Sequence, residues 1–173
     1  PPMSFGNMPN DGGGLILSEK EKQDFINKFP EGYIFIKELI GSNEFISGKK
    51  RYCLWLDDDN LENASKFNFI KDRIKITEKH RLNSKDSGTN ELANYSHRFR
   101  DTKTTTTQSV IIPSVSSENR MYIPIGFVEN NSIILNSAQA IYDIEPWVFG
   151  VVTSSIHLVW VMAVGGKLES RIR

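Results

Sequence analysis

The chain has 173 residues, and its 21 basic and 21 acidic side chains cancel, so its net charge neither indicates nor excludes a nucleic-acid partner. Its length and its 39% of hydrophobic residues suit one domain with a core of its own. The single cysteine, Cys53, excludes an internal disulfide and a cysteine-based zinc site. Its apolar neighbours predict a buried thiol in a reducing, cytoplasmic setting.

The first half of the chain predicts short helices and strands in alternation. Ser18 with Glu21 three residues later forms a capping box, which predicts a helix over 19–28. Aromatic and β-branched residues predict strands over 32–37 and 51–56, with turns at 41–43 and 47–50. Apolar positions interleaved with lysine and arginine predict an amphipathic helix over 61–82.

A long polar stretch follows, from Asn83 to Gln108, and it ends in four consecutive threonines. One interpretation is a mobile surface loop, which such a composition usually forms. The other is a loop that contacts DNA phosphates, because basic and hydroxyl side chains suit that role. Under the second interpretation, the candidate phosphate contacts in this stretch and just beyond it are Arg98, Arg100, Lys103, Thr105 and Arg120.

The second half predicts strands over 110–113, 121–127 and 133–135, and then a long apolar helix over 146–166. The polar residues in the middle of that helix, His157 among them, favour a buried core helix over a membrane span. A glycine pair, Gly165 and Gly166, then turns the chain into a charged segment. The expected fold class is α+β: a mixed, mostly antiparallel sheet with a few flanking helices and long polar loops.

The sequence lacks the motifs of an assembled active site. It has no glycine-rich cofactor loop and no catalytic tetrapeptide of the NPPY type. Residues 19–22 contain the letters of a metal-dependent nuclease motif, but they stand at the start of a predicted helix, which favours a chance match. The acidic run 57–59 predicts a solvated loop, because no further ligands stand at calcium-loop spacing. These observations favour binding over catalysis, with no catalytic residue and no metal site.

Ordered motifs run through almost the whole chain. They are SFGNMPNDGG at 4–13, GSxEFIxG at 41–48, RYCLWL at 51–56, IPxVSSExRxYIPIGF at 112–127 and FGVxxSxxHxxWxxxVxGxLxS at 149–170. Together they resemble the target recognition domain of MmeI-like (type IIL/IIG) restriction–modification enzymes. In that family one polypeptide carries a nuclease, an adenine-N6 methyltransferase and this domain, which selects the DNA sequence for both activities.

The resemblance implies a domain organisation and a set of partners. Residues 1–14 would be a linker from a methyltransferase domain, and residues 15–173 a recognition domain truncated at its C-terminal end. The expected partners are double-stranded DNA and the methyltransferase domain of the same polypeptide, with no membrane. This part would need no cofactor, whereas the parent enzyme would use S-adenosylmethionine and Mg²⁺. Two alternatives stay open: a stand-alone DNA specificity subunit, and a protein-interaction module that docks through Trp147 and Trp160.

The resemblance also implies which side chains read bases. The motif positions are Glu169, Arg171 and Arg173, with Asn136 or Ser137 and the serine turn at Ser114 and Ser116 as further readers. Residues two apart in an extended segment share a face. A carboxylate accepts from cytosine N4, and an arginine fork donates to guanine O6 and N7. Glu169 and Arg171 could therefore read one C·G pair; the other interpretation is an exposed ion pair of little energetic value.

Overall fold

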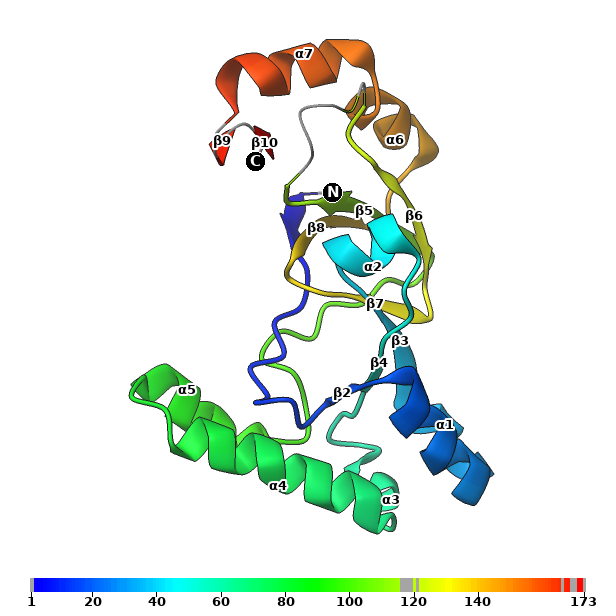
Figure 1. Ribbon diagram of the computed structural model, residues 1–173, viewed down its shortest axis with the longest axis vertical. Helices are drawn as coiled ribbons and strands as arrows, with labels where there is room; N and C mark the ends of the chain where they lie inside the picture. The colour runs from blue at the N-terminus through cyan, green and yellow to red at the C-terminus, as the bar shows by residue number, and fades with distance from the viewer. Residues whose placement is uncertain (1, 116–119, 121, 166, 169–170, 173) are drawn as a thin grey trace. The chain divides into compact units, whose positions relative to one another are not determined.

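The computed structural model describes residues 2–115, 120, 122–165, 167–168 and 171–172 (Figure 1). The chain forms two units, which are described separately. Unit 1 comprises Pro1–Gly6, Ile40–Lys49 and Lys103–Arg173, and unit 2 comprises Asn7–Leu39 and Lys50–Thr102. Both units combine helices with antiparallel strands, so the predicted α+β class is confirmed.

The core of unit 1 is an antiparallel sheet in the order β1-β8-β5-β6. The central strand pair is visible in Figure 1, where β5 and β8 run side by side. Val110 pairs with Ile141, and Ile111 pairs with Ala140, and all four are buried. The strands are β1 (Met3–Phe5), β5 (Gln108–Pro113), β6 (Gly126–Glu129) and β8 (Ala138–Tyr142).

The two faces of this sheet pack against different helices, because successive side chains of a strand point to opposite faces. Ile111 belongs to a buried cluster that the ring of Phe45 from α2 (Ser42–Ser47) covers. Val110 belongs to a second cluster, and Phe149 from α6 (Pro146–Val152) packs against it. The Phe127 and Phe149 ring centroids lie 4.5 Å apart.

Two sequence predictions in unit 1 are wrong in part, and one strand of this unit was not predicted. The predicted strand over 121–127 begins only at Gly126 among the described residues, because Pro124 cannot donate to a ladder. The predicted turn at 41–43 is the start of α2, where the carboxylate of Glu44 accepts a hydrogen bond from Gly41 N at 3.0 Å. The strand predicted over 133–135 is β7 (Ser132–Ile134), as expected, but β8 follows it and was not predicted.

The apolar segment predicted as one buried helix is two exposed helices. α6 ends at Val152 and α7 (Ser155–Val164) begins after Ser154, whose hydroxyl accepts from His157 N at 3.2 Å. Neither helix has a buried residue. No single helix among the described residues is long and apolar enough to cross a membrane; α6 and α7 reach that length only as a pair bent by 53°.

The expected anchoring of this segment is therefore right for one residue and wrong for others. Phe149 packs against the sheet, and Leu158 is half-buried. The apolar pattern also predicts that Trp147, Trp160 and Val164 pack against the sheet, but they lie largely in solvent, with exposed fractions of 65%, 60% and 62%. After α7 the backbone forms two short paired strands, β9 (Lys167–Leu168) and β10 (Arg171–Ile172).

Unit 2 contains a small antiparallel sheet in the order β2-β4-β3. Its strands are β2 (Ile16–Leu17), β3 (Ile36–Ile40, the last residue of which belongs to unit 1) and β4 (Tyr52–Leu54). Cys53 in β4 is fully buried as predicted, and burial raises the pKa of its thiol. The predicted strand over 32–37 is mostly a 3-10 helix, η1 (Pro30–Phe35), which Pro30 begins and in which Gly32 packs against the ring of Phe25.

The helices of unit 2 confirm one boundary and correct another. α1 (Glu19–Lys28) starts at the capping box of Ser18 and Glu21 that the sequence predicts. The helix predicted over 61–82 is broken into α3 (Leu61–Ala64) and α4 (Asn68–Leu82), because Phe67 at the junction packs into a cluster of phenylalanine rings. Two further short helices follow, α5 (Ser87–Glu91) and η2 (Leu92–Tyr95).

Candidate nucleic-acid interface

Three serines far apart in the sequence meet in unit 1, and we call them the serine junction: Ser42, Ser114 and Ser137. The Ser42 hydroxyl donates to Ser137 O and accepts from Ser114 N at 3.3 Å. Ser42 N donates to the Ser137 hydroxyl at 3.2 Å. The junction brings two of the predicted base readers together, and Asn136 precedes Ser137 in the same turn.

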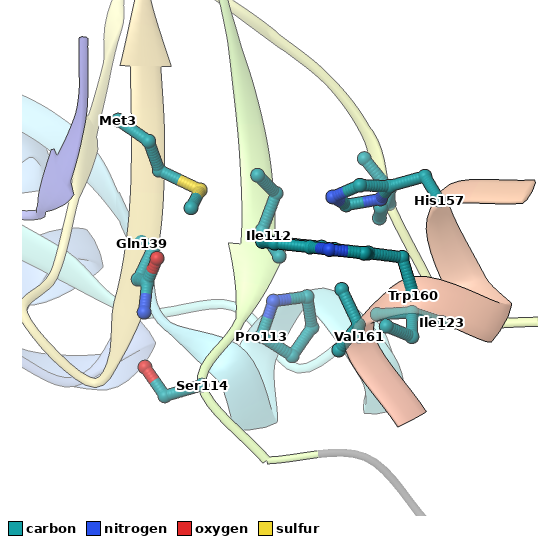
Figure 2. Close-up of a pocket in the computed structure, with 10 residues that line it drawn as sticks. Met3, Ile112, Pro113, Ser114, Ile123, Gln139, His157, Trp160 and Val161 are labelled. Atoms are coloured by element: carbon teal, nitrogen blue, oxygen red, sulfur yellow. The ribbon is translucent and has the colours of Figure 1, made fainter. Parts of the chain in front are cut away.

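The Ser114 hydroxyl has no hydrogen-bond partner although its oxygen is buried. It lines a pocket of about 210 Å³ between the sheet and α7. Figure 2 shows Ser114 and Gln139 on one side of this pocket and Trp160 and His157 on the other. No sequence motif indicates this pocket, because its lining residues come from segments that are far apart in the chain.

Three of the four consecutive threonines of the polar stretch, Thr105, Thr106 and Thr107, form a tight loop around Asp143. Its Oδ1 atom accepts from the Thr105 hydroxyl at 2.7 Å, from Thr106 N at 2.8 Å and from Thr107 N at 3.1 Å. The Thr106 and Thr107 hydroxyls donate to the same oxygen. These hydrogen bonds, led by that of Thr105, hold the pKa of Asp143 well below its usual range. The loop is therefore built on a fixed negative charge that sequence reasoning missed.

The predicted phosphate contacts of unit 1 differ in the contacts that their side chains make within the protein. The Lys103 ammonium donates to Phe5 O at 2.8 Å and contacts the Ser4 hydroxyl at 3.4 Å. Thr105 donates its hydroxyl to Asp143. Arg120 is exposed. The structure thus fixes the first two side chains to neighbouring backbone and carboxylate groups.

The predicted phosphate contacts of unit 2 lie at the end of the loop after η2. The Arg98 guanidinium lies 4.5 Å from the centre of the Tyr95 ring and 3.4 Å from an exposed carboxylate oxygen of Asp58. That carboxylate also lies 2.9 Å from His97 Nε2, and burial lowers the pKa of His97 despite this neighbour. Arg100 contacts the Met8 sulfur at 3.5 Å. Both arginines are positioned by residues of their own unit.

A buried arginine, Arg81, holds the backbone of this loop through hydrogen bonds. It is 0% exposed, and its five N–H groups all donate to backbone carbonyls. The acceptors, at 2.8 to 3.0 Å, are the carbonyls of Pro9, Asn10, Leu92, Tyr95 and Arg98. The interpretation of 83–108 as a mobile loop is therefore wrong for its first part.

Sequence reasoning missed Arg81, although the spacing of α4 held a signal for it. Ile70, Thr77 and Arg81 share one helix face, at intervals of seven and four residues, and all three are buried. A basic residue on the buried face of a helix needs hydrogen-bond partners inside the protein, because burying a charge without partners is unfavourable.

The remaining predicted base readers fall partly outside the described residues. Glu169, Arg173 and Ser116 lie outside them. The backbone of Arg171 lies in β10, paired with Leu168 of β9. A lone histidine in an apolar helix is typical of a structural residue with its hydrogen bonds satisfied, and the Nδ1 atom of His157 lies 2.8 Å from Val152 O. Among the described residues, no group of three or more histidine, cysteine or acidic side chains is arranged to hold a metal ion.

Comparison with known proteins gives consistent matches over the whole chain. The family model described as "MmeI, target recognition domain" matches residues 1–173. DNA methyltransferase A of Bacillus subtilis (strain 168) is 47% identical over 173 residues, which are 100% of this chain and 20% of that protein. The solved structure of the type IIL restriction–modification enzyme MmeI in complex with DNA matches with a TM-score of 0.93 and 37% identity. That match covers 100% of this chain and 23% of the MmeI chain.

Proposed function

Because this chain belongs to the MmeI target recognition domain family, we propose that it binds double-stranded DNA and selects the sequence on which the rest of its polypeptide acts. The observation that carries the proposal is the whole-length likeness, at a TM-score of 0.93, to a protein solved in complex with DNA. The chain spans about a fifth of the curated relative, so catalysis would belong to other parts of the polypeptide.

The parent enzyme we propose is a methyltransferase that modifies adenine N6, with a nuclease in the same chain. The similarity to DNA methyltransferase A supports the methyltransferase part. S-adenosylmethionine and Mg²⁺ would bind outside this domain. A cytoplasmic location follows from a role on chromosomal and incoming DNA.

The proposed base readers are Glu169, Arg171 and Arg173. The proposed further readers are Asn136, Ser137, Ser114 and Ser116. The carboxylate of Glu169 would accept from cytosine N4, and the guanidinium of Arg171 would donate to guanine O6 and N7. Hydroxyl groups suit contacts to any base edge, so the serines would add less selectivity.

The proposed phosphate contacts are Arg98, Arg100, Lys103, Thr105 and Arg120. Arg98 stacks on the Tyr95 ring and pairs with the exposed carboxylate of Asp58; such an ion pair is a weak interaction and can exchange for a phosphate. Neutral net charge does not oppose this role, because phosphate binding depends on local positive groups.

The test exchanges the two charges of the reading pair. We expect the full-length protein with Glu169→Lys and Arg171→Asp to recognise a different base at one position of its site, because donor and acceptor are exchanged. Sequencing that maps methylated adenines in cells expressing the variant measures this directly. An unchanged site contradicts the assignment of these two residues.

A matched control separates reading from phosphate binding. Arg98→Met should weaken binding to every sequence and lower the salt dependence by about one unit of slope. If it instead relaxes one base position only, Arg98 is a base reader and the phosphate assignment is wrong.

A further inference from the structure

Seven large apolar side chains of α6 and α7 are exposed, and we call them the α6–α7 surface: Trp147, Val151, Ile156, Val159, Trp160, Met162 and Val164. Their exposed fractions run from 44% at Met162 to 82% at Ile156. Single exposed apolar side chains are ordinary, but a group of this size on two adjacent helices marks an interaction site.

The helix α7 is apolar on all sides, and its own unit covers only one of them. His157, Leu158 and Val161 are half-buried on one side of the helix, and His157 and Val161 line the pocket against β5. Ile156 and Val159 lie on the opposite side and are exposed. A helix that is apolar all round is normally buried, so the outward side calls for a covering surface.

A pocket adjoins the α6–α7 surface, and Trp160 belongs to both (Figure 2). Its floor is Ile112 and Pro113 of β5, and Met3 lines it from β1. Its volume of about 210 Å³ is below the range of about 300–1,000 Å³ of sites for small molecules. The size and the apolar lining suit a single anchoring side chain from a protein partner.

The chemistry of this surface does not suit DNA. No aspartate, glutamate, lysine or arginine stands between Pro146 and Gly166. The hydroxyls of Thr153 and Ser154 donate to backbone carbonyls of α6, and the Trp147 indole donates to Glu145. The surface therefore offers nothing to neutralise phosphates, which dominate protein–DNA affinity.

We propose that the α6–α7 surface docks against another part of the same polypeptide, one of whose apolar side chains enters the pocket beside Trp160. In both proteins matched over the whole of this chain, the chain corresponds to only 20% and 23% of the length, so most of the polypeptide is available as a partner. A partner on the same chain acts at an effective concentration of the order of millimolar, which favours it over a second copy at micromolar concentration.

The docking would fix the orientation of the recognition domain in its enzyme. Domains of one chain move relative to each other unless their interface is large and hydrophobic. An apolar interface at α6–α7 would hold unit 1, with its serine junction and β10, at a set distance from the catalytic parts. The proposal is tested by the solvent access of the α6–α7 surface in the absence of DNA. Its outcome is therefore independent of the proposed base reading.

The test measures oxidation of the full-length protein by hydroxyl radicals, without DNA. We expect Trp160 and Met162 to react at least tenfold more slowly in the native protein than after unfolding, because the partner surface covers them. Rates within about twofold of the unfolded protein would overturn the proposal, as would protection that appears only when DNA is added. Protection that weakens on dilution, together with a dimer mass by light scattering, assigns the surface to a second copy and also overturns it.

A pair of variants supplies the second measurement. Ile156→Asp with Val159→Asp in the full-length protein should raise the oxidation of Trp160 at least fivefold and speed proteolytic release of this domain. The matched control is Ile76→Asp, which changes an exposed apolar residue of α4 in unit 2. Equal effects of the control and the double variant would contradict a docking role for α6–α7.

Discussion

The two units of this chain differ in the side chains that characterise them, a buried arginine in unit 2 and a group of exposed apolar residues on two helices in unit 1. In unit 2 the fully buried Arg81 has five carbonyl acceptors, and the half-buried Arg73 donates to Gly14 O, to Ile16 O and to Glu21. Unit 1 leaves tryptophan and isoleucine side chains of α6 and α7 in solvent. The contrast indicates that internal hydrogen bonds of arginine stabilise unit 2, whereas the exposed apolar residues of unit 1 provide a surface for binding a partner.

The largest expected effect on stability comes from replacing Arg81. Arg81→Met leaves five partly buried carbonyls without their donor, and each unsatisfied buried group costs about 1–3 kcal/mol, partly relieved here by solvent and by relaxation. We expect the free energy of unfolding to fall by about 4 kcal/mol, measured by urea denaturation.

Lys71→Met is the matched control for Arg81, because Lys71 lies exposed on the same helix. It should change stability by less than about 0.5 kcal/mol. Equal losses in the two variants would show that the buried hydrogen bonds of Arg81 contribute little.

A pair of glycines tests unit 1 in the same way, with a smaller effect. A Cβ atom at Gly6 would lie 2.5 Å from Leu135 O, whereas at Gly150 in α6 it would meet nothing within 4 Å. Gly6→Ala should destabilise the protein by about 2 kcal/mol, because the backbone must shift. Gly150→Ala should stabilise it by about 0.7 kcal/mol through helix propensity. Thermal denaturation measures both, and equal signs would contradict this account of the two positions.

The smallest expected effect concerns Asp143, the exposed charge that orders the threonine loop of unit 1. Asp143→Asn keeps one acceptor oxygen and tolerates the φ of 50° at this position, but it removes the charge. Hydrogen exchange at Thr106 N and Thr107 N should become roughly tenfold faster. Glu129→Gln, an exposed change in β6, should leave both rates unchanged.

The same loop should respond to pH in one direction. The pKa of Asp143 is lowered in the folded protein, so its stabilising effect is fully present above the unfolded value of about 3.9 and is lost as pH falls below it. The Asp143→Asn protein should show no such response to pH, because it lacks the charge. If the two amides of the parent protein also stayed equally protected well below that pH, this would contradict the role of the charge.

The sequence predicted local features well and distant ones poorly. The capping box of Ser18 and Glu21 depends on residues three apart, and it is present as expected. The burial of Cys53 follows from its apolar neighbours. By contrast, β8 contains two alanines and a glutamine, which have little strand preference, and it forms because β1 and β5 pair with it on either side.

The apolar helix was the main error, and its cause is physical. Apolar composition predicts that a segment is covered, but it does not say by which surface. The sequence predicts that the core of this domain covers the helix, whereas Ile156 and Trp160 are exposed to solvent.

The candidate site was only partly predictable, for a related reason. Ser114 and Ser137 were chosen by motif, but their meeting depends on Ser42, which is more than 70 residues from Ser114. Glu169 and Arg173 lie outside the described residues, so their roles rest on the resemblance and on the chemistry of their side chains.

The serine junction also has a consequence for how recognition can change. The bond that ties residue 114 to Ser42 uses the backbone N–H of residue 114, which every amino acid except proline provides. The Ser114 hydroxyl takes no part in it. The framework therefore places no chemical demand on the side chain at this position, so a different residue there could alter what the domain recognises while the backbone keeps its course. Position 137 is less interchangeable, because its hydroxyl is an acceptor for Ser42 N.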